Sequence, residues 1–154
     1  RACREGGPGQ RFTVPLTRKL QQLVEDLAVL EDPQERLGVI VDRAKRLPPL
    51  PAAERIDENR VQGCVSVVWL LGEMRDGSCH FRSDADSPVV RGLLAVLCEF
   101  FTGFPPALVA VSDADPLDAL GITRNLSPTR RNGLTAARLR IRELAAQWAK
   151  AEKQ

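Results

Sequence analysis

The spacing of apolar residues along the first third of the chain predicts two helices. Residues 20–30 carry leucine and valine at helical spacing, which predicts a first helix that begins near Thr17. A second apolar stripe over residues 37–47 predicts a helix that begins after Asp32. That helix should end at the LPPLP run (47–51), because proline disfavours helical conformation in the residue before it.

The middle of the chain has a different pattern. Residues 65–71 are mostly β-branched or aromatic, which favours a strand. Asp76-Gly77 is typical of a hairpin turn, so residues 78–83 should form the returning strand. Residues 60–62 are expected to add a short third strand. A sheet this small needs helices packed on one face to be stable.

Four pairs of a cap residue and a proline mark further helix starts. The side chain of Asp or Ser can accept from the free amides of a first helical turn, where proline loses no hydrogen bond. The pairs are Asp32-Pro33, Ser87-Pro88, Asp115-Pro116 and Ser127-Pro128. They predict a buried helix over 88–101, a short helix over 116–120 with Gly121 as its C-cap, and a long last helix from Pro128. A further short helical piece is expected near 105–111.

The order of these elements predicts one α+β domain, a small three-stranded antiparallel sheet flanked by helices on its N- and C-terminal sides. We divide the chain into a flexible arm (1–16), a single domain (17–150) and a tail (151–154). The arm is rich in Gly and Arg, and its sequence fits a trimmed targeting peptide, an expression remnant or a loose arm equally well.

Composition and charge narrow the classes of partner. Hydrophobic residues make up 44% and charged residues 27% of the 154, which is close to the globular average. No apolar run approaches the roughly 20 residues of a membrane helix, so we expect no membrane association. The net charge of +2 argues against a nucleic-acid partner. Residues 72–123 carry eight acids and three bases, and residues 124–154 carry eight bases and two acids. This asymmetry either steers a charged partner or solvates the surface.

The four cysteines are Cys3, Cys64, Cys79 and Cys98, and their spacing fits neither a zinc motif nor a disulfide framework. A reducing compartment is therefore expected. Cys79 and Cys98 fall inside predicted elements and are interpreted as structural, and Cys3 as incidental. Cys64 follows Gly63 at the entrance of a strand, where a glycine permits a tight backbone and close approach by another molecule.

Cys64 is thus the candidate nucleophile, although a cysteine is more often an inert small hydrophobe. A Cys–His hydrolase would require His80, the only histidine, to reach it. A metal site would combine Cys64 with Cys98, His80 and Asp84 or Asp86, and the spacing of these residues does not favour one. Trp69 is expected in the core.

Three stretches read together resemble the SufE family of sulfur acceptors in iron–sulfur cluster assembly. They are ENRVQGCVSVVWL (58–70), HFRSDADSPVVRGLLAVL (80–97) and LSPTRRNGL (126–134). The resemblance runs from about Pro33 to Ala145. It departs at Val65, where the family commonly has a polar residue, and the N-terminal arm has no counterpart.

The resemblance implies an accessory sulfur carrier, an enzyme only in the loose sense of a sulfurtransferase. Cys64 would take persulfide sulfur from a SufS- or CsdA-type cysteine desulfurase and pass it to an iron–sulfur scaffold complex. The chain itself would need no cofactor, since the pyridoxal phosphate belongs to the desulfurase, and no metal. Gly63, Asp86 and Arg130 are the candidate partner-binding residues, and a cap is the plainer role for Asp86.

The resemblance also implies an α+β fold similar to that of cluster scaffolds. A cytoplasmic location is expected, or a plastid if the arm is a transit peptide. The alternatives are a cluster- or metal-binding scaffold of related fold and a module that regulates a desulfurase without taking sulfur.

Overall fold

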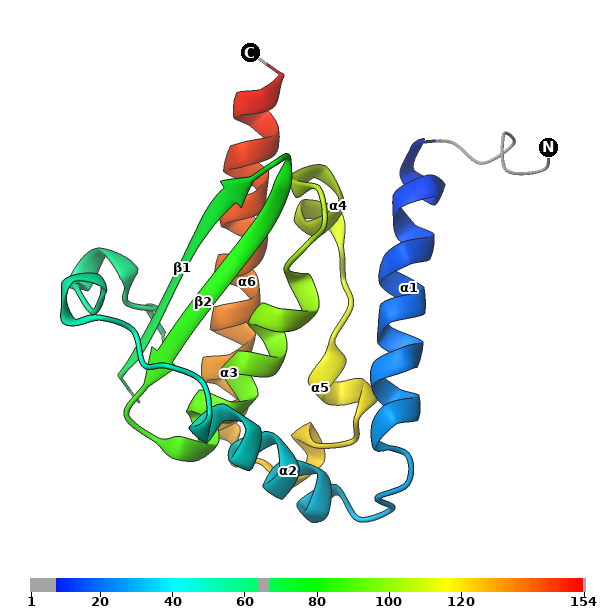
Figure 1. The fold of residues 1–154 in the computed structure, drawn as a ribbon, viewed down its shortest axis with the longest axis vertical. Coiled ribbons are helices and arrows are strands. Elements are labelled where there is room, and N and C mark those ends of the chain that lie inside the picture. Colours follow the sequence, from blue (N-terminus) through cyan, green and yellow to red (C-terminus); the bar gives the residue numbers. More distant parts are fainter. Residues whose placement is uncertain (1–7, 64–66, 154) are drawn as a thin grey trace.

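The structure is a computed structural model that describes the backbone of residues 8–63 and 67–153 and the side chains from Leu16 onward. Its elements follow the predicted order of helices, hairpin and helices (Figure 1). The helices are α1 (Pro8–Leu27), α2 (Pro33–Lys45), α3 (Pro88–Phe101), α4 (Pro106–Val111), α5 (Pro116–Ala119) and α6 (Pro128–Glu152). The strands are β1 (Val68–Arg75) and β2 (Ser78–Ala85), and short 3-10 turns are η2 (Ala52–Glu54), η3 (Asp57–Asn59) and η4 (Thr123–Asn125).

The predicted cap pairs begin four of these helices. Asp32 accepts from the Gln34 amide at 3.0 Å, and Asp115 accepts from the Asp118 amide at 3.2 Å. The hydroxyls of Ser87 and Ser127 likewise accept from first-turn amides of α3 and α6. These starts were predictable because capping is a local interaction.

The start of α1 was predicted wrongly. The helix begins at Pro8, whereas the sequence pattern placed its start near Thr17. The apolar stripe from which the helix was predicted begins only at Leu20, so the pattern carries no signal for the preceding turns. From α1, the ammonium group of Lys19 donates to the carbonyl oxygens of Glu99 and Thr102, at 2.8 and 3.1 Å. This contact fastens α1 to the end of α3.

The hairpin is antiparallel, in a register that runs from Val68 opposite Ala85 to Arg75 opposite Ser78. The turn between the strands is the predicted Asp76-Gly77, and both residues have positive φ. The prediction of a third strand was wrong: within the described residues the sheet has two strands. Residues 60–62 contribute one isolated bridge, between Arg60 and Trp69. Pairing stops there because the chain turns at Gly63, where φ is +85°.

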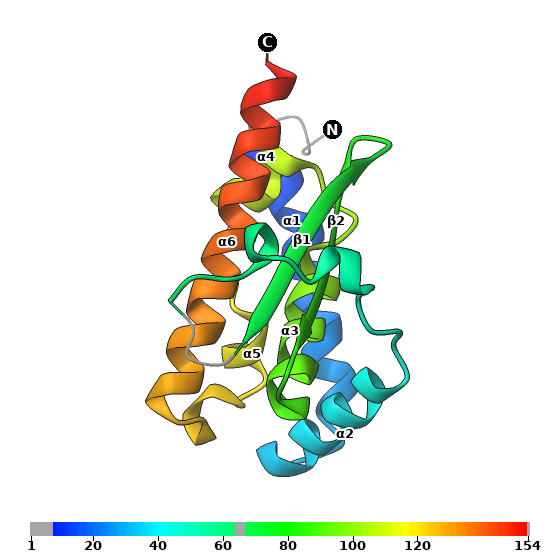
Figure 2. The same cartoon turned by 90° about the vertical axis from the view of Figure 1, so that its left-hand side faces the viewer.

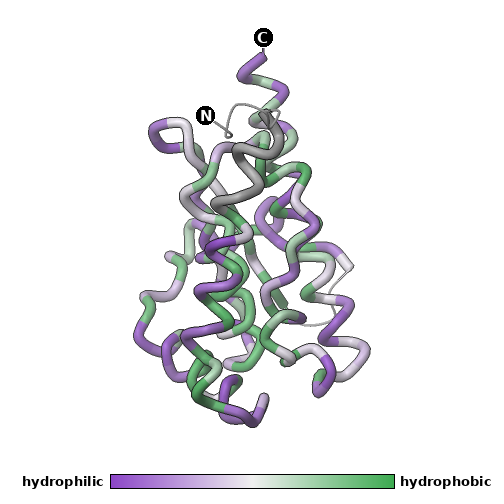
Figure 3. Tube along the Cα trace, turned by 90° about the vertical axis from the view of Figure 1, so that its right-hand side faces the viewer, coloured by the Kyte–Doolittle hydropathy of each residue, from purple (hydrophilic) through white to green (hydrophobic). Residues whose placement is uncertain are grey.

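One face of the hairpin packs on α3 and α6 (Figure 2). Alternate strand residues, including Val68, Leu70, Cys79 and Phe81, are buried there. Phe81 stacks on Trp148 of α6, with ring centroids 5.7 Å apart. Polar and apolar positions alternate along the helices, as expected for elements with one buried side (Figure 3). The packing of these side chains fixes the position of the end of the hairpin at which β1 begins.

Candidate functional site

Cys64 lies outside the described residues, as do Val65 and Ser66. The residue before it is described: Gly63 is exposed and has a φ of +85°, a conformation that favours glycine. A Cβ added at Gly63 would lie 3.8 Å from the Cβ of Ala136 on α6. The chain therefore enters the segment that carries Cys64 directly beside α6.

On the far side of this segment the chain joins the hairpin. The carbonyl of Val67 accepts from the Asp86 amide at 3.2 Å, and Val68 begins β1 opposite Ala85. The carboxylate of Asp86 is exposed and makes no hydrogen bond or ion pair to any other described residue. Ser87, and not Asp86, caps α3. The cap interpretation of Asp86 is thus wrong, and its side chain faces solvent close to residue 67.

Arg130 lies on the first turn of α6 and is exposed. It borders a small depression of about 10 Å³ with an apolar lining that includes Val68, Val90 and Leu134. Arg130 therefore lies near the start of β1. The three predicted partner-binding residues lie near the two ends of the undescribed segment 64–66. Gly63 directly precedes it, the Asp86 amide is bonded to Val67 directly after it, and Arg130 borders Val68.

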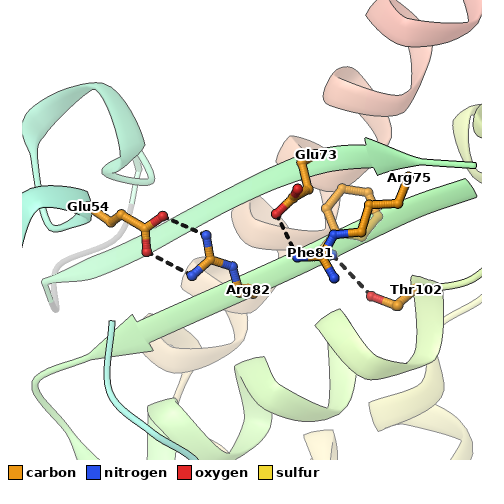
Figure 4. Close-up of polar contacts among 6 residues, drawn as sticks. All are labelled: Glu54, Glu73, Arg75, Phe81, Arg82 and Thr102. Carbon is orange, nitrogen blue, oxygen red and sulfur yellow. Dashed lines mark hydrogen bonds and ion pairs between the residues drawn. The ribbon is translucent and has the colours of Figure 1, made fainter. Parts of the chain in front are cut away.

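A long connection, residues 51–63, crosses the hairpin between α2 and β1; we call it the strap. Its Glu54 forms a bidentate ion pair with Arg82 of β2, with N–O distances of 2.6 and 2.7 Å (Figure 4). The hydrogen bond from Arg82 lowers the pKa of the Glu54 carboxyl. The Asn59 side chain donates to the Glu54 carbonyl at 2.8 Å. The ion pair holds the first half of the strap on the sheet, and the Asn59 hydrogen bond links its two halves.

The strap is also joined to β1, through Arg55 and Val61. The Val61 amide donates to the Val68 carbonyl at 2.9 Å. The guanidinium of Arg55 lies over the Trp69 ring, 5.9 Å from its centroid. Trp69 is half-buried on the outer face of the sheet beneath the strap, and this differs from the expectation that it lies in the core. The strap thus leads to Gly63 along an anchored path.

Asp84 is a buried carboxylate on β2, 6% exposed. The Arg91 Nε lies 3.1 Å from its Oδ1, and its Oδ2 accepts from the Leu50 amide at 3.1 Å. This carboxylate is satisfied by an arginine and a backbone amide, so it serves to tie Leu50, the residue before the strap, to the hairpin. Within the described ranges, no group of three His, Cys, Asp or Glu residues converges as a metal site.

The position of His80 argues against a Cys–His hydrolase. His80 is opposite Glu73, near the hairpin turn, whereas the start of β1 is opposite Ala85. Five strand positions separate His80 from Ala85, which is roughly 17 Å at the rise of an antiparallel strand. The hairpin therefore holds the imidazole near the end opposite to that at which the Cys64 segment joins it.

The described cysteines are poor nucleophiles. Cys79 and Cys98 are buried, in agreement with the structural role expected for them. Burial raises the pKa of the Cys79 thiol to about 11 and that of Cys98 to about 12. Only the thiolate is nucleophilic, so both groups are inactive near neutral pH. Cys3 lies outside the described residues.

The contacts of the strap were not found from the sequence. Arg82, Glu54 and Asp84 are ordinary charged residues in polar surroundings, and nothing in their spacing indicates which of them pair. The stretches DENR (57–60) and SDADS (83–87) are dense in carboxylates, which indicated capping and solvation of the surface and no particular pairing. Among the described residues, no helix is long and apolar enough to cross a membrane.

The arrangement defines a small α+β domain whose candidate nucleophile follows Gly63 in the sequence, before the strand that begins the hairpin. Residues 21–145 match SufE, described as an Fe-S metabolism associated domain. The chain belongs to the SufE family, which is associated with Fe–S metabolism.

Three relatives are similar in sequence over most of this chain. An uncharacterized SufE-like protein of Rhizobium etli is 36% identical over 82% of this chain and 88% of its own length. An uncharacterized SufE-like protein of Synechocystis is 32% identical over 77% of this chain and 74% of its own. SufE-like protein 1, chloroplastic/mitochondrial, of Arabidopsis thaliana is 32% identical over 77% of this chain and 32% of its own length.

A solved structure shares the fold. The solution structure of a hypothetical protein from Thermus thermophilus has a TM-score of 0.67 and 23% sequence identity, covering 84% of this chain and 94% of that one. The α+β fold expected from the sequence is confirmed, apart from the third strand.

Proposed function

We propose that this chain accepts sulfur from a cysteine desulfurase on Cys64 and activates that enzyme. The support is the anchored entry to the Cys64 segment, with Gly63 in a left-handed conformation between α6 and β1. The sequence motif at 58–70 and membership of the SufE family point to the same chemistry. In this proposal the protein acts as an accessory carrier, and bond breaking between carbon and sulfur is left to its partner.

The transfer is a thiol–persulfide exchange. The Cys64 thiol loses its proton, and the thiolate attacks the outer sulfur of the partner's persulfide. A new sulfur–sulfur bond forms on Cys64 as the old one breaks, and the partner's cysteine leaves as thiolate and takes up a proton. No net oxidation occurs, because the zero-valent sulfur only changes carrier. The step requires that the Cys64 thiol be accessible to the partner and oriented toward its persulfide.

The proposed partners follow from this chemistry. The donor is a SufS- or CsdA-type desulfurase that holds the pyridoxal phosphate, and the recipient is an iron–sulfur scaffold complex. Asp86 and Arg130, both exposed and both beside the Cys64 segment, are the proposed docking contacts. A cytoplasmic location, or a plastid one, belongs to the same proposal.

The proposal is tested with Cys64→Ser and, as a matched control, Cys3→Ser. Each protein is added to a SufS-type desulfurase with cysteine, and alanine release is measured. We expect Cys64→Ser to abolish stimulation and Cys3→Ser to retain it. Full stimulation by Cys64→Ser would instead identify a regulator that takes no sulfur. Metal analysis of the purified protein tests the alternative of a metal- or cluster-binding scaffold.

A further inference from the structure

Arg140 connects α6 to the strap. Its Nη2 donates to the Glu58 carbonyl at 3.2 Å, across 82 positions of sequence. Its Nε is buried and has no hydrogen-bond partner within the described part of the chain. Unpaired buried donors are rare in native proteins and call for an explanation. The contact with Glu58 provides one, because it keeps the guanidinium beneath the strap.

The strap contacts α6 at two successive turns. Gly63 lies against Ala136, and Glu58 is bonded to Arg140, which is four residues further along the same side of the helix. The remaining attachments of the strap join it to the hairpin, including the Val61 amide. Hydrogen bonds from a charged donor are stronger than those between neutral groups. Arg140 is therefore the polar link that sets the distance between the strap and α6.

We propose that Arg140 is a positioning residue: by holding the Glu58 carbonyl it fixes the course of the strap and the position of Gly63, the residue directly before Cys64. Four residues separate Glu58 from Gly63, and Cys64 follows Gly63 directly. A strap released from α6 would let Gly63 take many positions, few of them suited to attack by the following cysteine on a partner's persulfide. The part of this inference that concerns sulfur transfer rests on the proposed function.

The variant Arg140→Met removes the donors and the charge while keeping an apolar stem of similar length. Arg142→Met is the matched control. Arg142 is also a half-buried arginine of α6, and its Nε donates to the carbonyl of Ala110 at 3.5 Å, so it faces α4 and not the strap. Arg140→Lys keeps the charge and one donor for the Glu58 carbonyl.

The first readout is amide hydrogen exchange at Val61, whose N–H is bonded to Val68. Loss of a charge-assisted hydrogen bond should make this amide exchange about tenfold faster in Arg140→Met than in wild type. We expect Arg142→Met to leave it unchanged and Arg140→Lys to exchange more slowly than Arg140→Met. The role of this hydrogen bond would be overturned if the Val61 amide exchanged equally fast in Arg140→Met and Arg142→Met. Equal exchange in Arg140→Met and Arg140→Lys would overturn it too.

The second readout is desulfurase stimulation as a function of protein concentration. A misplaced nucleophile lowers the rate within the complex, so Arg140→Met should reduce the maximal stimulation by about tenfold with little change in the half-saturating concentration. Faster exchange at Val61 with unchanged maximal stimulation would overturn the positioning role and leave the acceptor function intact. If wild-type protein takes no sulfur, the proposed function fails, and the exchange comparison alone then decides whether Arg140 positions the strap.

Discussion

Gly72 allows the packing of the hairpin on α6 to be tested by a single methyl group. Gly72 lies on β1 opposite Phe81, beneath the stacked ring of Trp148. A Cβ at this position would lie 2.7 Å from the Trp148 ring and 2.9 Å from that of Phe81. Both distances are shorter than van der Waals contact, so Gly72→Ala must displace one of the two rings.

The expected magnitude is the difference of two effects. Forcing an extra methyl into a packed core costs about 1 to 3 kcal/mol. Replacing a glycine with alanine in an element interior returns about 0.5 to 1 kcal/mol through chain entropy. From the midpoints of these two ranges, we expect Gly72→Ala to lower the free energy of unfolding by about 1.3 kcal/mol. In a chain of this length that corresponds to a fall of about 3 to 5 °C in Tm.

The assay is urea unfolding followed by circular dichroism, with Gly38→Ala as the control. Gly38 lies in α2, and a Cβ there would meet nothing within 4 Å. That variant should be more stable than wild type by about 0.5 to 1 kcal/mol. In a Trp148→Leu background the cost of Gly72→Ala should shrink, because one of the two rings is gone. A Gly72→Ala protein as stable as Gly38→Ala would refute the packing described for this face.

Three further results are expected. Asp84→Ala leaves the Arg91 guanidinium without its carboxylate and the Leu50 amide without its acceptor, and we expect a loss of about 3 to 5 kcal/mol in urea unfolding; a loss below about 1 kcal/mol would mean that the pair is solvated. Burial raises the pKa of Cys98 from 9.0 to about 12, so its thiol ionises first in the unfolded chain. The contribution of the neutral Cys98 thiol to the free energy of unfolding is therefore fully present below pH 9. It falls as the pH rises toward 12, by up to about 1.4 kcal/mol per pH unit. Cys98→Ala should have a shallower fall in unfolding free energy over this range, and an identical slope would contradict the assignment. Arg130→Glu should raise the half-saturating concentration for desulfurase stimulation about tenfold at low salt, with unchanged Tm. The control Arg46→Glu, at an exposed position of the same charge, should leave the half-saturating concentration unchanged. Equal effects of the two variants would mean that Arg130 acts only through the overall charge of the protein.

Local signals predicted most of the fold. The cap–proline pairs and Asp76-Gly77 specify helix starts and the hairpin turn through contacts within a few residues, and these predictions are confirmed. The expected third strand depended on how far residues 60–62 pair with β1. The positive φ of Gly63, which ends that pairing, is compatible with glycine anywhere and cannot be read from its identity alone.

The sequence predicted only part of the candidate site. The three family-like stretches drew attention to Gly63, Asp86 and Arg130. In the structure the Asp86 amide is bonded to the Val67 carbonyl, and Arg130 borders the same depression as Val68. The strap contacts were not predicted, because the pairing of Glu58 with Arg140 joins positions 82 residues apart. No periodicity or cap signal encodes such a contact, since it arises from how α6 and the strap cross after the core has packed.

The most direct test of the account is the mass of the protein after incubation with a SufS-type desulfurase and cysteine, followed by mapping of the modified peptide. The account predicts a gain of one sulfur atom on the peptide that contains Cys64, removed by a thiol reductant and lost in Cys64→Ser. A protein that stimulates the desulfurase yet gains no sulfur, or that gains it on another cysteine, would contradict the account.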